Sequence, residues 1–218
     1  MFHKKVRKHR KEREDGGVTQ QQTREVAQRA AQTGDKYLEL MAEAARYGSK
    51  EDWRRAGKTL REAIALRPDE DTTYFNLGAV LGNSGHVVEA AQRFLEARDR
   101  QPVGSEDWAK STANAFDMLR LDQCAEVAKP EWWNDAGLKA LSARVVRAAP
   151  NNQATTQMRA SVLCGATFCA WEAGPRSAAE LKEAVTCFER TAAIHPAPAA
   201  RAKLLSLADW CRSQAGAL

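Results

Sequence analysis

The sequence of 218 residues has no long hydrophobic run and few of the residues that interrupt helices. No stretch approaches the roughly 18 apolar residues that a membrane-spanning helix needs, so we expect no membrane association. The 13 glycines and 7 prolines stand at intervals, as they do where they separate helices. With 44% hydrophobic and 28% charged residues, the composition is that of a globular protein with a buried core.

Cysteine and histidine are few and scattered. The five cysteines form no C-x-x-C pair, and no apolar segment follows Met1 and Phe2, so we expect free thiols in an intracellular compartment, cytoplasmic or nuclear. None of the four histidines has a His or Cys partner at metal-ligand spacing. Neither a phosphate-binding glycine loop nor a nucleophile motif occurs. We therefore expect no metal, no cofactor and no catalytic residues.

Positive charge is concentrated at the N-terminus. Residues 1–14 hold seven basic residues against Glu12 and Glu14, a net +5 that equals the net charge of the whole chain. The rest of the chain is therefore neutral, which argues against a nucleic-acid-binding surface on the folded part. The basic residues are Lys4, Lys5, Arg7, Lys8, Arg10, Lys11 and Arg13.

Three roles fit this basic segment, which we assign to a disordered tail over residues 1–18. Lys4-Lys5-Val6-Arg7 resembles a monopartite nuclear-import signal. The same run would also neutralise phosphates of RNA or of the ribosome. In the third role the tail is a solvated segment that only keeps the protein soluble. We expect nucleic acid to bind, if at all, through this tail.

A period of 34 residues organises the centre of the chain. Apolar residues recur at helical spacing on both sides of a turn signal at residues 83–85, and a proline ends the second helix. Each unit is thus predicted to be an antiparallel helix pair, and such pairs bury their apolar faces only by stacking. The positions that match at this offset are Pro102 with Pro68, Ala97 with Ala63, Phe94 with Leu60, Ala90 with Ala56, and Leu81 with Tyr47.

Small residues are predicted where the two helices of a unit cross. Gly78 and Ala90 permit close approach at an interaxial distance of about 8–10 Å. Phe94 and Tyr74 fill the space beside the crossing. In the preceding unit, residues 49–52 resemble a capping box that starts the second helix.

This pattern resembles the tetratricopeptide repeat. Residues 37–70 match in their second helix and depart in their first, where Glu43 and Ala44 replace Leu and Gly. The resemblance implies an all-α, right-handed superhelical solenoid of antiparallel helix pairs, with repeats at 37–70 and 71–104. The match is closest at Tyr74, Leu77, Gly78, Leu81, Gly85, Ala90, Phe94, Ala97 and Pro102.

The flanking parts of the chain are assigned to divergent helix pairs and caps. The pair at 105–150 has predicted helices at 105–119 and 131–149. The pair at 151–196 has one from Met158 to Trp171 and one that Ser177 to Glu180 caps. A capping helix at 199–214 closes the segment 197–218. A flanking helix from 19 to about 32, within 19–36, is expected to pack on the first repeat.

The resemblance implies a concave groove lined by the first helix of each pair. The groove offers apolar side chains beside a few polar groups, which suits an apolar or amphipathic helix, or an extended peptide. The family's clamp for acidic chaperone tails is not expected, because only one of its positions is matched. The groove residues are Leu38, Met41, Ala45, Thr72, Phe75, Asn76, Ala79, Glu106, Lys110 and Ala113.

Three functions are consistent with these features. The first is a non-enzymatic adaptor or scaffold that binds a partner protein, as a peptide or helix, in the groove. The second is an RNA- or ribosome-associated, or nuclear, factor that uses the basic tail and docks proteins on its repeats. The third is an accessory domain that positions a substrate protein for an enzyme. A further alternative is that the helix at 19–32 occupies the groove itself.

Overall fold

The computed structural model of the chain describes residues 25, 28, 34–165 and 171–218. Over these residues the regular secondary structure is entirely helical, with nine α-helices, one short 3-10 helix and no strand. The predicted all-α class is therefore confirmed, and the handedness of a superhelix remains a prediction. The chain divides into two compact units, Met1–Gln101 and Pro102–Leu218.

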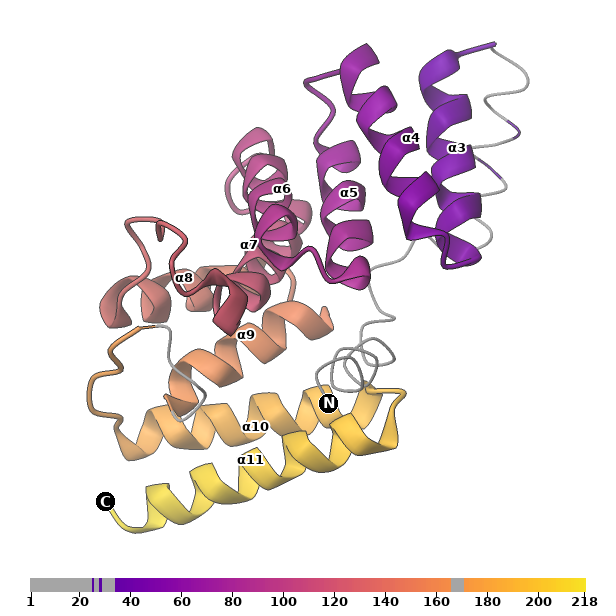
Figure 1. Cartoon of the computed structure of the whole chain (residues 1–218). Helices are drawn as coiled ribbons and strands as arrows, with labels where there is room; N and C mark the ends of the chain where they lie inside the picture. Colours follow the sequence, from indigo (N-terminus) through magenta and orange to yellow (C-terminus); the bar gives the residue numbers. More distant parts are fainter. Residues whose placement is uncertain (1–24, 26–27, 29–33, 166–170) are drawn as a thin grey trace. The chain divides into compact units, whose positions relative to one another are not determined.

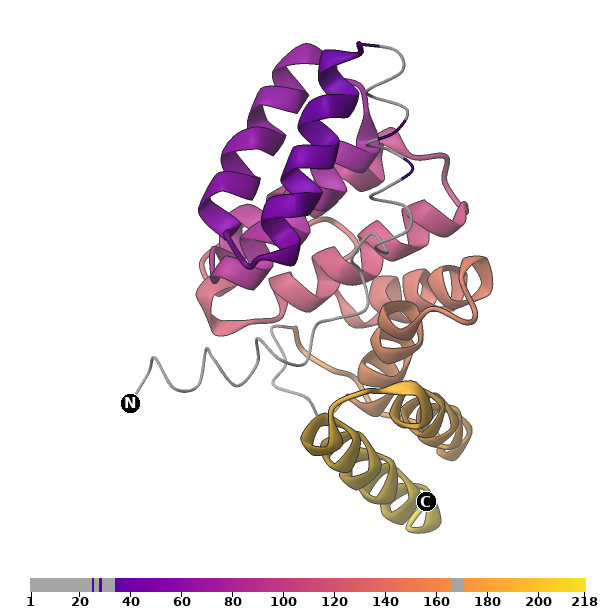
Figure 2. The same cartoon turned by 90° about the vertical axis from the view of Figure 1, so that its right-hand side faces the viewer.

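The first unit contains two helix pairs, and each helix packs against the next one along the chain (Figures 1 and 2). The turn inside the first pair differs from the prediction. Ser49 is the last residue of its helix, and the second helix is capped by Asp52, whose carboxylate accepts the N–H of Arg55. The helices are α3 (Lys36–Ser49), α4 (Trp53–Leu66), α5 (Asp71–Ser84) and α6 (Val87–Arg100).

The predicted crossing of small residues is confirmed between α5 and α6. A Cβ atom placed on Gly78 would lie 2.9 Å from Cδ1 of Phe94, closer than side-chain carbons approach one another. Ala90 and Ala97 are fully buried on the same side of α6. Gly85 ends α5 in the left-handed conformation, with φ 88°, which glycine adopts without steric cost.

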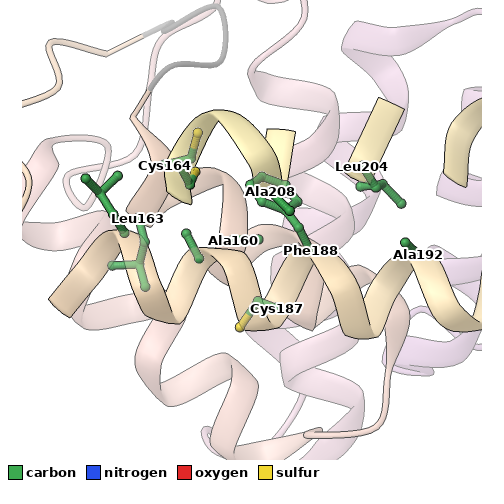
Figure 3. Close-up of a cluster of buried hydrophobic side chains, with 11 residues drawn as sticks. Ala160, Leu163, Cys164, Cys187, Phe188, Ala192, Leu204 and Ala208 are labelled. Atoms are coloured by element: carbon green, nitrogen blue, oxygen red, sulfur yellow. The ribbon is translucent and has the colours of Figure 1, made fainter. Parts of the chain in front are cut away.

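In the second unit the sequence-adjacent helices also pack on each other, and α7 contacts both α8 and α9. Side chains from α9, α10 and α11 form one buried cluster that contains Leu163, Phe188 and Leu204 (Figure 3). The elements are α7 (Glu106–Leu119), the 3-10 helix η1 (Asp122–Cys124), α8 (Asp135–Ala148), α9 (Gln153–Cys164), α10 (Ala178–Ile194) and α11 (Pro198–Gly216).

The helix predicted at 131–149 is shorter at its start, because two tryptophans belong to the preceding connection. Trp133 packs on Phe116 of α7, with ring centroids 5.6 Å apart, and on Trp171, at 5.9 Å. The ring of Trp132 lies 5.6 Å from that of Trp133, with the two planes tilted by 52°. This aromatic cluster anchors an irregular segment, so its apolar residues do not follow a helical period.

The predicted bounds of the helix from Met158 to Trp171 are wrong at both ends. It begins at Gln153, and its first turn holds Thr155 and Thr156, which are buried although their side chains are polar. Their hydroxyls donate to backbone carbonyls, which removes the cost of burying them. Gly165, with φ 66°, ends the helix after Cys164.

The two C-terminal helices agree with those predicted from the sequence. Ser177 caps α10 through the predicted capping box, in which Glu180 accepts the N–H of Ser177 and Ser177 accepts the N–H of Glu180. The capping helix predicted at 199–214 lies within α11. Among described residues, α11 is the last helix, and it packs on α10.

Arg176 connects three parts of the second unit. Its guanidinium donates to both carboxylate oxygens of Asp135, at 2.7 and 3.1 Å, and to the carbonyl of Val162, at 3.0 Å. Burial alone would raise the pKa of Asp135, but the hydrogen bonds and charges of Arg176 and Lys139 hold that pKa below its ordinary value. The start of α8, the last turn of α9 and the segment before α10 are thereby fixed together.

Two glycines provide a matched test of the packing between α5 and α6. Replacing Gly78 by Ala inserts a methyl group into the ring of Phe94, and we expect a loss of about 1–3 kcal/mol of unfolding free energy. At Gly57, inside α4, an added Cβ meets Val80 at 3.7 Å, an ordinary contact. Gly57→Ala should therefore stabilise the protein, by up to about 1 kcal/mol, through helix propensity.

Urea unfolding followed by circular dichroism measures both changes. The two variants should shift the unfolding midpoint in opposite directions. A Gly78→Ala protein at least as stable as the wild type would show that α6 does not approach α5 as closely as described.

Candidate functional site

Seven of the predicted groove residues lie on one side of α3 and α5 in the first unit, and we call this surface the α3–α5 face. All seven keep some solvent exposure. The opposite sides of the same helices are buried through Leu40 and Ala44 of α3 and through Leu77 and Gly78 of α5. The face consists of Leu38, Met41 and Ala45 from α3, and of Thr72, Phe75, Asn76 and Ala79 from α5.

A buried hydrogen-bonded chain joins the two helices beside this face. The hydroxyl oxygens of Tyr37 and Thr73 are 2.8 Å apart. The Thr73 hydroxyl also donates a hydrogen bond to the sulfur of Met41, at 3.7 Å. Burial raises the pKa of Tyr37, which keeps its phenol protonated and able to donate. These hydrogen bonds therefore fix the position of α3 relative to α5 beside the face.

The apolar residues of the face are supported from behind by the core. Phe75 meets Phe94 edge to face, with ring centroids 5.4 Å apart. Leu38 and Met41 are partly buried against the cluster of Tyr37, Leu40 and Ala63. The exposed parts of these side chains are thus held by packing, which lowers the entropy that they would lose on binding a partner.

Charge is absent from the α5 part of this surface. Asp71 is the only charged residue of α5, and its carboxylate accepts a hydrogen bond from Gln101 at 2.6 Å. From Thr72 to Ser84 the helix carries no charge.

The three remaining predicted residues lie on α7, in the second unit. Lys110 forms an ion pair with Glu106, with Nζ and Oε1 2.8 Å apart, and the hydrogen bond to Glu106 raises the pKa of the lysine. Ala113 is buried, so it offers no surface to a partner, contrary to its prediction as a groove residue.

Asn83 is a residue of the face that sequence reasoning missed. The sequence assigned it to the turn after α5, but the helix continues to Ser84. Asn83 is partly exposed and lies seven residues after Asn76, on the same side of the helix. The signal that was available is this spacing of seven, which continues the series of Thr72, Asn76 and Ala79.

The predicted basic tail, Lys4 to Arg13, lies outside the described residues, and so does most of the predicted helix at 19–32. Glu25 and Gln28 are described, and both are helical and exposed. None of the helices in the described part of the chain combines the length and the apolar character that crossing a bilayer requires.

The two histidines that the structure describes make short-range hydrogen bonds in the turns that hold them. His86 Nδ1 lies 2.9 Å from the hydroxyl of Ser84, and His195 Nδ1 accepts the N–H of Ala197. Across residues 34–165 and 171–218 no three His, Cys, Asp or Glu side chains are grouped as a metal site would require.

The described cysteines are free and buried, at positions 124, 164, 187 and 211, while Cys169 lies outside the described residues. Burial raises the pKa of Cys124 and of Cys187. A hydrogen bond with Cys164, together with burial, raises the pKa of Cys211. Since the thiolate is the reactive form, these thiols are suited to packing rather than to nucleophilic chemistry.

Comparisons of the sequence with protein-family models and with curated proteins find no match. The likeness to tetratricopeptide repeats therefore rests on the residues that form the period and on the pairing of α3 with α4 and of α5 with α6.

Proposed function

We propose that the chain is a non-enzymatic adaptor of the tetratricopeptide type, in which the α3–α5 face binds a segment of a partner protein. One observation supports this most strongly: Leu38, Met41 and Phe75 remain partly exposed on the same two helices that bury Leu40, Leu77, Val80 and Leu81. Exposed apolar side chains that lie together, on a fixed framework, are typical of protein-binding surfaces. The proposed setting is the cytoplasm or the nucleus.

The alternative in which the face is only a packing surface for the helix at 19–32 leads to a different expectation. In that case, substitutions on the face would lower stability and leave partner binding unchanged. In the proposed function they abolish binding while the fold persists.

A pull-down with the full chain distinguishes these expectations. Met41→Glu and Phe75→Glu each place a charge on the α3–α5 face, and we expect each to reduce partner recovery at least about tenfold, since burying an unpaired charge is costly. Leu66→Glu is the control, because Leu66 is 52% exposed and belongs to α4 rather than to either helix of the face. Circular dichroism checks that all three variants remain folded.

The proposal fails if both face variants retain every partner that the wild type and the Leu66→Glu variant recover. It also fails if partner loss is accompanied in each case by loss of helical signal.

A second candidate function is association with RNA or the ribosome, favoured by the seven basic residues within residues 1–14 of an otherwise neutral chain. Deleting residues 1–15 should abolish RNA binding, and the affinity of the intact chain should fall as salt rises, because binding releases counterions. Filter binding at several salt concentrations measures both effects. RNA affinity that is unchanged by the deletion, or absent at low salt, contradicts this candidate.

A further inference from the structure

Two buried thiols of the second unit lie in contact, although their helices are not consecutive in the chain. Cys164 is the last residue of α9, and Cys211 lies near the end of α11. The two residues are 1% and 0% exposed, and their thiols are hydrogen-bonded to each other. Both belong to the buried cluster in which Figure 3 labels Cys164 beside Leu163. A bond between the two sulfurs would therefore connect α9 directly to α11.

This contact distinguishes the pair from the other thiols that the structure describes. Cys187 belongs to the same cluster, but burial and the charge of Glu183 raise its pKa, and no second thiol contributes. Burial raises the pKa of Cys124, and the charge of Lys129 opposes that change. Within the described ranges, the contact of one thiol with another is thus the contact of Cys164 with Cys211.

The helix that carries Cys211 is the last one described, and its start is weakly held. Its N-cap residue, Ala197, has no side chain that could accept the first N–H groups. Terminal helices of this kind open locally at a lower free energy than the whole unit unfolds. The docking of α11 depends on one buried stripe, which consists of Ala200, Leu204, Ala208 and Cys211.

The docked and open states of α11 differ in the reactivity of this thiol. While α11 is docked, the hydrogen bond with Cys164 and burial raise the pKa of Cys211, so the reactive thiolate does not form. In the open state both causes are removed, and a fraction of Cys211 is thiolate at neutral pH. An oxidant in solution therefore reacts with Cys211 after α11 has opened, and redocking returns the oxidised sulfur to Cys164.

We propose that Cys164 and Cys211 form a reversible disulfide when a peroxide reaches Cys211 in the open state of α11, and that this bond locks α11 onto α9. The proposal does not depend on peptide binding by the α3–α5 face. Disulfides inside cells are typically transient and belong to redox-sensing proteins. The C-terminal helix is thus free to open in the reduced protein and is held closed in the oxidised protein.

The oxidation proceeds in two steps. In the open state the Cys211 thiolate attacks one oxygen of hydrogen peroxide, the O–O bond breaks, and hydroxide leaves. Cys211 becomes a sulfenic acid, and the hydroxide takes up the proton that the thiol had released. After redocking, the sulfur of Cys164 attacks the sulfenic sulfur, the S–O bond breaks, and the hydroxyl leaves as water with the proton of Cys164. The two thiols thereby lose two electrons and two protons, and one peroxide is reduced to two molecules of water.

Peptide mapping identifies the bond. The full chain with Cys169→Ser is treated with hydrogen peroxide, the remaining thiols are blocked with N-ethylmaleimide under denaturing conditions, and the protein is digested with trypsin without reduction. We expect a linked pair of peptides, residues 160–176 and 204–212, in which Cys164 and Cys211 are then the only cysteines. The link should disappear on treatment with dithiothreitol and in Cys211→Ser. Cys187→Ser is the matched control, because it removes a buried thiol of the same cluster and should leave the link intact.

The rate of linkage tests the requirement for opening. Leu204→Ala removes buried contacts of α11 and should raise this rate at least about tenfold, because it increases the population of the open state. Urea below the unfolding transition should raise the rate of the wild type in the same direction, without any substitution. A wild-type rate that urea leaves unchanged would contradict oxidation through the open state.

Hydrogen exchange tests the lock. We expect the amides of α11 in the linked protein to exchange at least about 30-fold more slowly than in the reduced protein, since a cross-link restricts the open state. Peroxide should not change this exchange in Cys211→Ser. The amides of α3, in the first unit, are the internal reference and should exchange equally in both forms.

The proposal fails if exhaustive treatment with peroxide leaves Cys164 and Cys211 available to N-ethylmaleimide, or if Cys211 becomes linked to a second chain instead. It also fails if the linked protein exchanges the amides of α11 as fast as the reduced protein, because the bond would then not hold the helix.

Discussion

The close approach of α6 to α5 at Gly78 determines which side of α5 is buried and which side is open. The ring of Phe94 occupies the space of the missing side chain, so α5 is held in one rotational setting against α6. In that setting Tyr74, Leu77 and Leu81 are buried, and Thr72, Asn76, Ala79 and Asn83 are left toward solvent. The residues of the repeat pattern thus specify packing, and the candidate binding surface consists of the positions that the pattern leaves free.

The period of 34 residues predicted α3 to α6 because each of these helices has a regular apolar stripe. The prediction failed where burial follows other rules. Trp133 is buried in a connection by contacts with the rings of Phe116, Trp132 and Trp171. Thr155 and Thr156 are buried through hydroxyl hydrogen bonds. The contacts of Arg176 join residues 14 and 41 positions apart, and no local pattern reveals them.

Within the site, the residues of α3 and α5 that the sequence assigned to the groove keep some solvent exposure, and their role in binding remains a prediction. The predicted surface extends too far in one place and not far enough in another. Ala113 is buried, and a small residue gives no sequence signal that separates a core position from an exposed one. Asn83 was taken as a turn residue, since Asn, Ser and Gly in succession are typical of turns. Only the position of the left-handed residue, Gly85, shows that the helix includes it.

The central claim is that α5 has one packed side and one open side, and thiol labelling tests it most directly. Ala79→Cys and Ala90→Cys would each be made with Cys169→Ser, since the other native thiols are buried. We expect a charged maleimide to label Ala79→Cys at least about 100-fold faster than Ala90→Cys, whose position becomes accessible only through unfolding. Equal, slow labelling of both variants would mean that the α3–α5 face is covered and would contradict the account.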